Sequence, residues 1–282
     1  MVLQGQIDVL SERISEREAR IREREATVRE REATVRAHES VIDMLRGAAP
    51  GELWPQPGED VAGSIDAIVP RLKGWCTPRK AHWLAQMVQR YQARQICEIG
   101  VFGGRSLLPM ALAARDIPGA VVWAVEPWSN AVAVEHATSE ENDLWWREID
   151  MQEIKRGFLD AVHGSQLNGT VKVVELPSDA AQLGFAQGTS IRFDLLHIDG
   201  SHAGPQALAD VRNWLPLVAP GGIIVLDDIG WDSVAQAQNF LRRECETISE
   251  VREEDEVTTY GAYRVPALEK AKPAEAPVLQ TA

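Results

Sequence analysis

The chain has 282 residues, of which 45% are hydrophobic and 25% are charged. This composition excludes a wholly disordered chain, and the length suits one full-sized domain with an appendage. The net charge of -13 argues against a nucleic-acid partner bound through its phosphates. No apolar stretch approaches the roughly 20 residues that span a bilayer, and no secretory signal is recognisable. The three cysteines are widely spaced, which fits reduced thiols and predicts a cytoplasmic location.

Residues 1–46 are expected to form one long charged helix. Between Glu12 and Arg36 there are eight Arg and seven Glu, and several Glu precede an Arg by four positions, the favourable order on a helix. Apolar residues recur at every seventh position, at Ile7, Ile14, Ile21, Val28, Val35 and Ile42. This period is typical of a left-handed coiled coil, but the second seam contains Arg17, Arg24, Arg31 and His38. We therefore expect a homo-oligomer formed through this helix or, alternatively, a solvated helix that associates weakly.

The rest of the chain divides into a linker, a domain and a tail. Residues 47–59 contain three Pro and three Gly and are expected to be the linker, and the Pro/Ala-rich residues 266–282 a disordered tail. Residues 60–265 alternate strand and helix patterns, with strands expected at 95–99, 121–125, 171–175, 193–198, 223–226, 248–252 and 258–265. This alternation predicts an α/β domain with a Rossmann-like, doubly wound, mainly parallel seven-stranded sheet. In such sheets, ligands bind at the carboxyl ends of the strands.

The first strand of this domain leads into the turn Glu98-Ile99-Gly100-Val101-Phe102-Gly103-Gly104. A glycine-rich turn between a strand and a helix lets a ligand approach the backbone closely. The spacing differs from the G-x-G-x-x-G of dinucleotide-binding proteins, and Glu98 suits an ammonium group better than a pyrophosphate. Glu126 ends the second strand, where a carboxylate can accept both hydroxyls of a ribose. Ser178 and Asp179 follow the third strand and are placed to reach an adenine edge. Together these features predict a site for S-adenosylmethionine.

With these features, residues from about 95 to 230 resemble the class I S-adenosylmethionine-dependent methyltransferases. Within that class they are similar to a branch that contains macrolide-sugar O-methyltransferases and proteins named cephalosporin hydroxylases. The resemblance implies that Glu98, Gly100 and Gly104 belong to the methionine-binding loop and that Glu126 holds the ribose. It covers about half of the chain and does not include the N-terminal helix.

Acidic residues end two further strands. Asp199 follows the apolar run LLHI, and Asp227 and Asp228 follow IIVL. If the two strands are neighbours, three carboxylates converge and would repel one another in a low-dielectric cleft unless a cation binds. Oxygen ligands favour Mg²⁺, with Mn²⁺ or Ca²⁺ as alternatives. The resemblance likewise assigns a metal to Asp199, Asp227 and Asp228, because metal-dependent O-methyltransferases carry their ligands at these strand ends.

His202 lies three residues after Asp199 and is the candidate base that would take the proton of an acceptor hydroxyl near neutral pH. The related sugar enzymes share the stretch IDGSH, and the resemblance implies the same role for its histidine. Structural alternatives remain for these residues. His202 and Asp227 could cap helices, and Asp199 could stabilise the tight turn at Gly200. His197 faces into a strand and is expected to be a packed core histidine.

Residues 127–169 are too many for a simple crossover and are expected to form helices over the site, as a lid or acceptor wall. Trp145 and Trp146, within this segment, and Trp231, after the acidic pair, are candidate acceptor contacts, although Trp is first of all a large core residue. The sequence thus predicts a metal-dependent O-methyltransferase that acts on a small-molecule or glycan acceptor. The alternatives are a nucleotide-dependent oxidoreductase on a similar fold and a non-catalytic cofactor-binding scaffold of a biosynthetic complex.

Overall fold

The structure is a computed structural model, and it describes residues 60–135, 139–254 and 257–267. The predicted helix of residues 1–46, the linker of residues 47–59 and most of the predicted tail lie outside the described residues, so the coiled coil and its homo-oligomer stay predictions. No helix in the described ranges is long and apolar enough to cross a membrane.

A seven-stranded sheet with the order β3-β2-β1-β4-β5-β7-β6 forms the centre of the domain. Its strands are β1 (Gln95–Ile99), β2 (Val121–Val125), β3 (Val171–Val174), β4 (Phe193–Ile198), β5 (Val218–Asp227), β6 (Glu246–Arg252) and β7 (Thr259–Arg264). The first five strands are parallel, whereas β7 runs antiparallel to both β5 and β6. The sheet is therefore mixed, and the last two strands form an antiparallel hairpin. β1 and β4 are central neighbours, which places the glycine turn beside Asp199.

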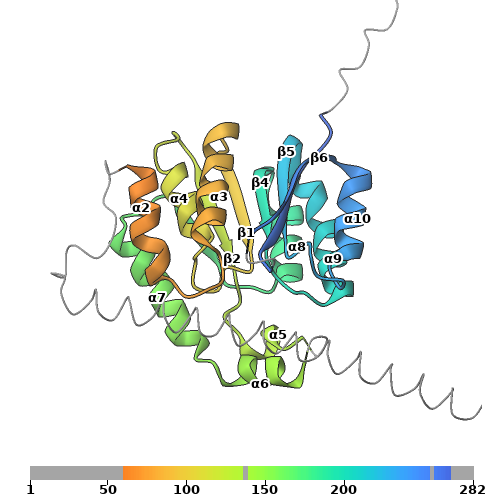
Figure 1. Cartoon of the computed structure of the whole chain (residues 1–282). Helices are drawn as coiled ribbons and strands as arrows, with labels where there is room; N and C mark the ends of the chain where they lie inside the picture. The colour runs from red at the N-terminus through yellow and green to blue at the C-terminus, as the bar shows by residue number, and fades with distance from the viewer. Residues whose placement is uncertain (1–59, 136–138, 255–256, 268–282) are drawn as a thin grey trace, which may run out of the picture.

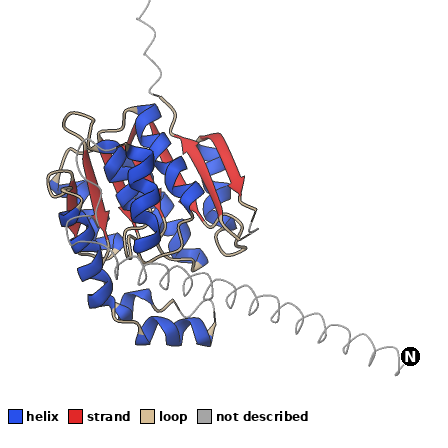
Figure 2. Ribbon diagram, turned by 60° about the vertical axis from the view of Figure 1, so that its left-hand side comes forward, coloured by secondary structure: helices blue, strands red, loops and turns tan. Residues whose placement is uncertain are grey.

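Helices cover both faces of the sheet (Figures 1 and 2). On one face lie α2 (Val61–Ile68), α3 (Pro78–Tyr91), α4 (Leu107–Ala114) and α7 (Met151–Gly164), and on the other α8 (Ser178–Gly188), α9 (Gly204–Trp214) and α10 (Ala235–Glu244). The short helices η1 (Val69–Arg71) and η2 (Leu215–Leu217) follow α2 and α9. This is the predicted doubly wound arrangement. Helix α2 and η1 were not predicted from the sequence.

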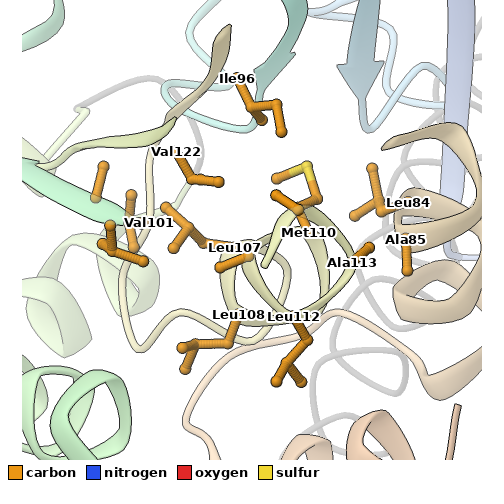
Figure 3. Packing of buried hydrophobic residues seen from close by; sticks show 14 of the residues in the cluster. Leu84, Ala85, Ile96, Val101, Leu107, Leu108, Met110, Leu112, Ala113 and Val122 are labelled. Carbon is orange, nitrogen blue, oxygen red and sulfur yellow. The ribbon is translucent and has the colours of Figure 1, made fainter. Parts of the chain in front are cut away.

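Helix α4, which follows the glycine turn, is buried on all sides (Figure 3). Leu107, Met110 and Ala113 pack in the same core cluster as Leu84 of α3 and Ile96 of β1. Because every residue of α4 is buried, the start of this helix is fixed relative to the sheet. The glycine turn therefore connects two elements that cannot shift independently.

The excursion after β2 forms three helices, α5 (Asn130–Ala133), α6 (Glu140–Glu148) and α7. In Figure 1, α5 and α6 lie beyond the end of the sheet at which β2 leaves it. The side-chain amide of Asn130 donates to the carbonyl oxygens of Trp146 and Ile149, both at 2.8 Å, and so holds α5 against the end of α6. The predicted helical insertion is thus present at the carboxyl ends of the strands.

The loop between β6 and β7 is tied to the start of α3. The carboxylate of Glu253, which is buried, accepts hydrogen bonds from the hydroxyl of Thr77 at 2.9 and 2.8 Å and from Tyr260 at 3.2 Å. Thr77 is the N-cap of α3, and its hydroxyl accepts from the amide of Lys80 at 3.1 Å. The last strands thereby fix the first turn of α3, on which Lys80 lies.

Candidate active site at the carboxyl ends of the strands

The glycine turn after β1 is shaped by the packing of the chain itself. Gly100 has φ +84°, and a Cβ added there would lie 2.0 Å from the carbonyl oxygen of Asp199. Gly104 has φ +80°, and its Cβ would lie 2.5 Å from the ring of Phe158 on α7. Both positions combine a left-handed backbone with a close neighbour, which only glycine tolerates. Gly100 therefore brings the β1 turn against the β4 turn, and Gly104 brings it against α7.

Glu98 lies beneath this turn, where the resemblance implies a contact with the methionine moiety. It is fully buried, and its Oε1 contacts the hydroxyl of Ser106 and Nδ1 of His197, the latter at 2.9 Å. Burial raises the pKa of Glu98 well above its usual value and lowers that of His197 to about 3. In this conformation Oε1 supports the turn from inside, while the buried Oε2 has no hydrogen-bond partner among the described residues. His197 is a buried core histidine, as predicted.

Glu126 connects the ends of β1 and β2. Its Oε2 accepts from the amide of Phe102, and its Oε1 accepts from the amide of Trp128, both at 3.0 Å. Burial raises its pKa, and these backbone hydrogen bonds oppose that rise. Each carboxylate oxygen can accept a second hydrogen bond. The partly exposed side chain therefore fits the predicted contact with two ribose hydroxyls while it holds the glycine turn.

The polar cap after β3 is less well placed than the sequence predicts. The hydroxyl of Ser178 donates to Asp210 at 2.6 Å and accepts from the indole of Trp214 at 2.9 Å, which ties α8 to α9. Asp179 is exposed in the first turn of α8, and its carboxylate accepts from the amide of Ala180 at 2.8 Å. Ser178 thus already has two protein partners, whereas Asp179 is accessible.

Strained backbone conformations gather at the same edge. Phe102, Trp128 and Asp228 have φ of 49°, 42° and 52°, in the left-handed region that side-chain-bearing residues rarely adopt. They lie in the turns that follow β1, β2 and β5. Such strain persists only where the surrounding structure enforces it, and it is common at functional sites. This edge is therefore the best candidate for the active site.

Four aromatic rings form a cluster above the glycine turn. Trp75 stacks on Phe102 with a centroid distance of 5.1 Å and meets Trp145 and Trp146 edge-on at 5.5 and 6.1 Å. Trp75 is 44% exposed. The backbone beside it is held by Arg105, whose guanidinium donates to the carbonyl of Gly74 at 3.2 Å. The predicted acceptor residues Trp145 and Trp146 thus belong to a partly exposed aromatic surface that we call the Trp75 cluster.

The three predicted metal ligands converge at the ends of β4 and β5, but a lysine lies among them. The ammonium group of Lys80 contacts Oδ2 of Asp227 and lies 3.4 Å from Oδ2 of Asp199. The side chain of Lys80 is only 4% exposed. The negative charge that predicts a cation here is therefore partly neutralised by the chain itself.

His202 lies on the other side of this group and is held by two carboxylates. Its Nε2 is 2.6 Å from Oδ2 of Asp228, its backbone amide donates to Glu135 at 2.7 Å, and its ring stacks on Trp231 at 4.9 Å. Burial alone would lower the pKa of His202, but the hydrogen bonds and charges of Asp228 and Glu135 raise it to about 10. At neutral pH the ring therefore carries a proton, and it must lose that proton before it can serve as a base.

The predicted oxygen-only metal set does not fit this arrangement. Asp227 faces Lys80, and Asp228 faces His202, so each of these two carboxylates already has a cation of the chain as a partner. A different group, formed by Asp199, His202 and Asp228, has ligand atoms within 4.8 Å of one another. It could hold a divalent ion only after His202 loses its proton, since an imidazolium is not a ligand. A small pocket lies beside this group and is lined in part by Asp199, His202 and Asp227.

Lys80, Glu135 and Trp75 belong to this site and were missed from the sequence. Lys80 did carry a signal, because a cation in the first turn of a helix is opposed by the helix dipole. A buried lysine in that position indicates a carboxylate partner from another element. Glu135 and Trp75 lie in loops, where no periodicity marks their direction.

The central part of the chain is similar to a known protein family. Residues 97–229 match a methyltransferase domain. The matching segment runs from β1 to just past Asp228 and includes the glycine turn, Glu126 and His202. No curated protein matches the chain.

The fold of this domain is shared with solved O-methyltransferases. One, from Bacillus cereus in complex with SAH, has 19% identity and a TM-score of 0.52, and the match covers 74% of this chain and 92% of that one. Another, TomG from Streptomyces achromogenes in complex with SAM and involved in tomaymycin synthesis, has 17% identity, a TM-score of 0.54 and coverage of 74% and 91%. These likenesses concern the fold.

Proposed function

We propose that this chain is an S-adenosylmethionine-dependent O-methyltransferase. The observation that carries the proposal is the pairing of the glycine turn after β1 with Glu126 at the end of β2, inside the segment that matches a methyltransferase domain. The binding of SAM and SAH by proteins of the same fold supports it. The narrower branch of macrolide-sugar enzymes and the cytoplasmic location remain predictions from the sequence.

In this proposal, the turn from Gly100 to Gly104 receives the methionine moiety, and Glu126 accepts the ribose hydroxyls. Asp179 is the accessible acid for the adenine side. Ser178 would take part only by giving up a hydrogen bond to α9. Glu98 acts from beneath the turn, where it fixes Ser106 at the start of α4 and His197 of β4. Its role is thus to position the loop.

At the other end of the site, His202 is the proposed acceptor of the proton from a hydroxyl group. S-adenosylmethionine supplies the methyl group, so the bond from carbon to sulfur breaks as the bond from carbon to the acceptor oxygen forms. The proton of the hydroxyl passes to the imidazole of His202 in its neutral form. Because Asp228 and Glu135 stabilise the protonated ring, the reaction is expected to speed up as the pH rises above neutrality. No step is assigned to the predicted Mg²⁺, since Lys80 and His202 already face its predicted ligands.

The acceptor is proposed to be a small molecule or glycan that carries a hydroxyl group. The Trp75 cluster offers flat, partly exposed rings beside the glycine turn, and such rings stack on sugar rings or aromatic groups. Trp231, which is 41% exposed and stacked on His202, offers a second such surface next to the proposed base. A sugar hydroxyl of a natural product fits both surfaces.

Calorimetric titration with S-adenosylhomocysteine tests the cofactor, with NAD as the control ligand. The expected result is saturable, micromolar binding of S-adenosylhomocysteine and no binding of NAD. A radiolabelled S-adenosylmethionine assay over a panel of glycosides and phenols then tests the transfer. Binding of NAD alone would establish the oxidoreductase alternative. Cofactor binding without turnover on any hydroxyl compound would favour the scaffold.

A further inference from the structure

Lys80 is a buried cation in a place where a helix does not favour one. It lies in the first turn of α3, and only 3% of the residue is exposed. Burying an ammonium group is costly unless it is paired, and breaking a buried pair leaves the partner charge uncompensated. The position of Lys80 is therefore determined by its partners and not by the preference of the helix.

Its partners come from the ends of two neighbouring strands. Asp227 closes β5, and Asp199 directly follows β4, so the register of the parallel pair places both carboxylates beside each other. Lys80 contacts Oδ2 of both. A divalent ion at the position that Lys80 occupies between these two carboxylates would need these oxygen atoms and would also be repelled by the ammonium group. The ammonium group and such an ion are therefore mutually exclusive.

The other acidic groups near Lys80 have partners of their own. Burial raises the pKa of Glu98, and its carboxyl group is bonded to His197. Nε2 of His197 in turn lies 3.7 Å from Oδ2 of Asp227. Asp228, the third carboxylate of the group, is paired with His202. Within the described residues of this cluster, the carboxylates of Asp227 and Asp228 thus each have a cation of the chain as a partner.

We infer that Lys80 supplies the positive charge between Asp199 and Asp227 that a divalent metal would supply, so that these two carboxylates do not form a metal site while Lys80 is present. Lys80 is a positioning residue: it fixes the two carboxylates beside the small pocket and partly neutralises them. Only the consequence for methyl transfer rests on the proposed function. The contacts of Lys80 with Asp199 and Asp227 do not depend on that function.

The test is a titration of full-length protein with Mn²⁺. Binding is measured as the loss of the electron paramagnetic resonance signal of the free ion. The wild type is compared with Lys80→Met and with Lys155→Met, a control in which the lost lysine pairs with Glu175 on the surface at 2.6 Å. Lys80→Met is expected to bind Mn²⁺ at least about tenfold more tightly than the wild type, because it frees two carboxylates. Mn²⁺ should also raise the Tm of Lys80→Met alone. Lys155→Met should behave like the wild type.

Equal Mn²⁺ affinity in the wild type and Lys80→Met would overturn the inference. If Lys80→Met does not fold, Asp227→Asn decides the question in the wild-type background. Saturable Mn²⁺ binding to the wild type that Asp227→Asn abolishes would refute the role of Lys80, whereas Mn²⁺ binding that Asp227→Asn leaves unchanged would support it. Titration of S-adenosylhomocysteine into the same samples separates this result from the proposed function, whose failure would remove nucleoside binding and leave the Mn²⁺ comparison intact.

Discussion

Nε2 of His202 lies 2.6 Å from Oδ2 of Asp228, so the proposed base is bonded to a residue that the sequence predicts as a metal ligand. Asp228 holds a left-handed backbone conformation at this point. The predicted base and one predicted metal ligand therefore form a single unit, an imidazolium bonded to a carboxylate. The protonation state of His202 is the first property of the site to measure.

We expect the imidazole of His202 to titrate near pH 10, as its pKa is raised from 6.5 to about 10 by Asp228 and Glu135 against the effect of burial. The stabilisation from this charged ring is fully present below the unfolded pKa of about 6.5 and is lost as the pH rises through about 10. Proton NMR of the histidine ring signals checks this, with His202→Gln to identify the signal. Asp228→Asn should lower the midpoint. A wild-type midpoint near 6.5 would contradict the pairing.

Gly100→Ala is expected to destabilise the domain by at least about 3 kcal/mol, because the added Cβ meets the backbone of Asp199 and the residue has φ +84°. Urea unfolding measures the change. Gly157→Ala is the matched control, since Gly157 lies in α7 with nothing within 4 Å of its added Cβ. That control should be neutral or stabilising by about 0.5–1 kcal/mol. Equal stability of the two variants would show that the turns of β1 and β4 do not touch.

Glu126→Gln should weaken S-adenosylhomocysteine binding by about tenfold. One carboxylate oxygen becomes an amide nitrogen that faces a backbone N–H of Phe102 or Trp128, so one hydrogen bond is lost and the glycine turn loosens. Calorimetry measures the affinity. Glu175→Gln, on an exposed residue that follows β3, serves as the control and should leave the affinity unchanged. Full affinity in Glu126→Gln would remove Glu126 from the cofactor site.

Trp145→Ala should raise the KM for a sugar acceptor by about tenfold and change kcat little, because stacking stabilises the bound acceptor and not the transfer itself. Leu144→Ala is the control on the same helix, since Leu144 is 50% exposed. Steady-state kinetics with the acceptor found in the screen measures both variants. A fall in kcat with unchanged KM would indicate that the Trp75 cluster serves folding of α6 and not acceptor binding.

Much of the fold is predictable from hydrophobic patterning. The bounds of β1, β2 and β4 agree with the sequence prediction, because each is a short apolar run bounded by polar or glycine residues. β5 is longer than predicted, since it begins at Val218 and continues through Gly221 and Gly222. Glycine is a poor strand residue, so this extension depends on tertiary context, including the backbone hydrogen bonds of Gly221 and Gly222 with Val265.

The site is predictable in its location but not in its pairings. The strand-end rule brings Asp199, Asp227 and Asp228 to one edge, as predicted. Which cation each carboxylate faces depends on α3 and on the loop of Glu135, segments far away in the sequence. The burial of Glu98 could likewise not be predicted, because an acid before a glycine turn has the same sequence pattern whether it faces a ligand or the core.

The contact between Glu253 and Thr77 links the last strands to the chemistry of the site. Because Thr77 caps α3 and Lys80 follows within the same turn, the position of the buried ammonium group depends on a carboxylate more than 170 residues away in the sequence. A substitution in the β6–β7 loop can therefore change the charge balance beside Asp199 without touching the pocket. Sequence variation in this distant hairpin can thus shift the pKa values of the groups at the reaction centre while every pocket residue stays the same.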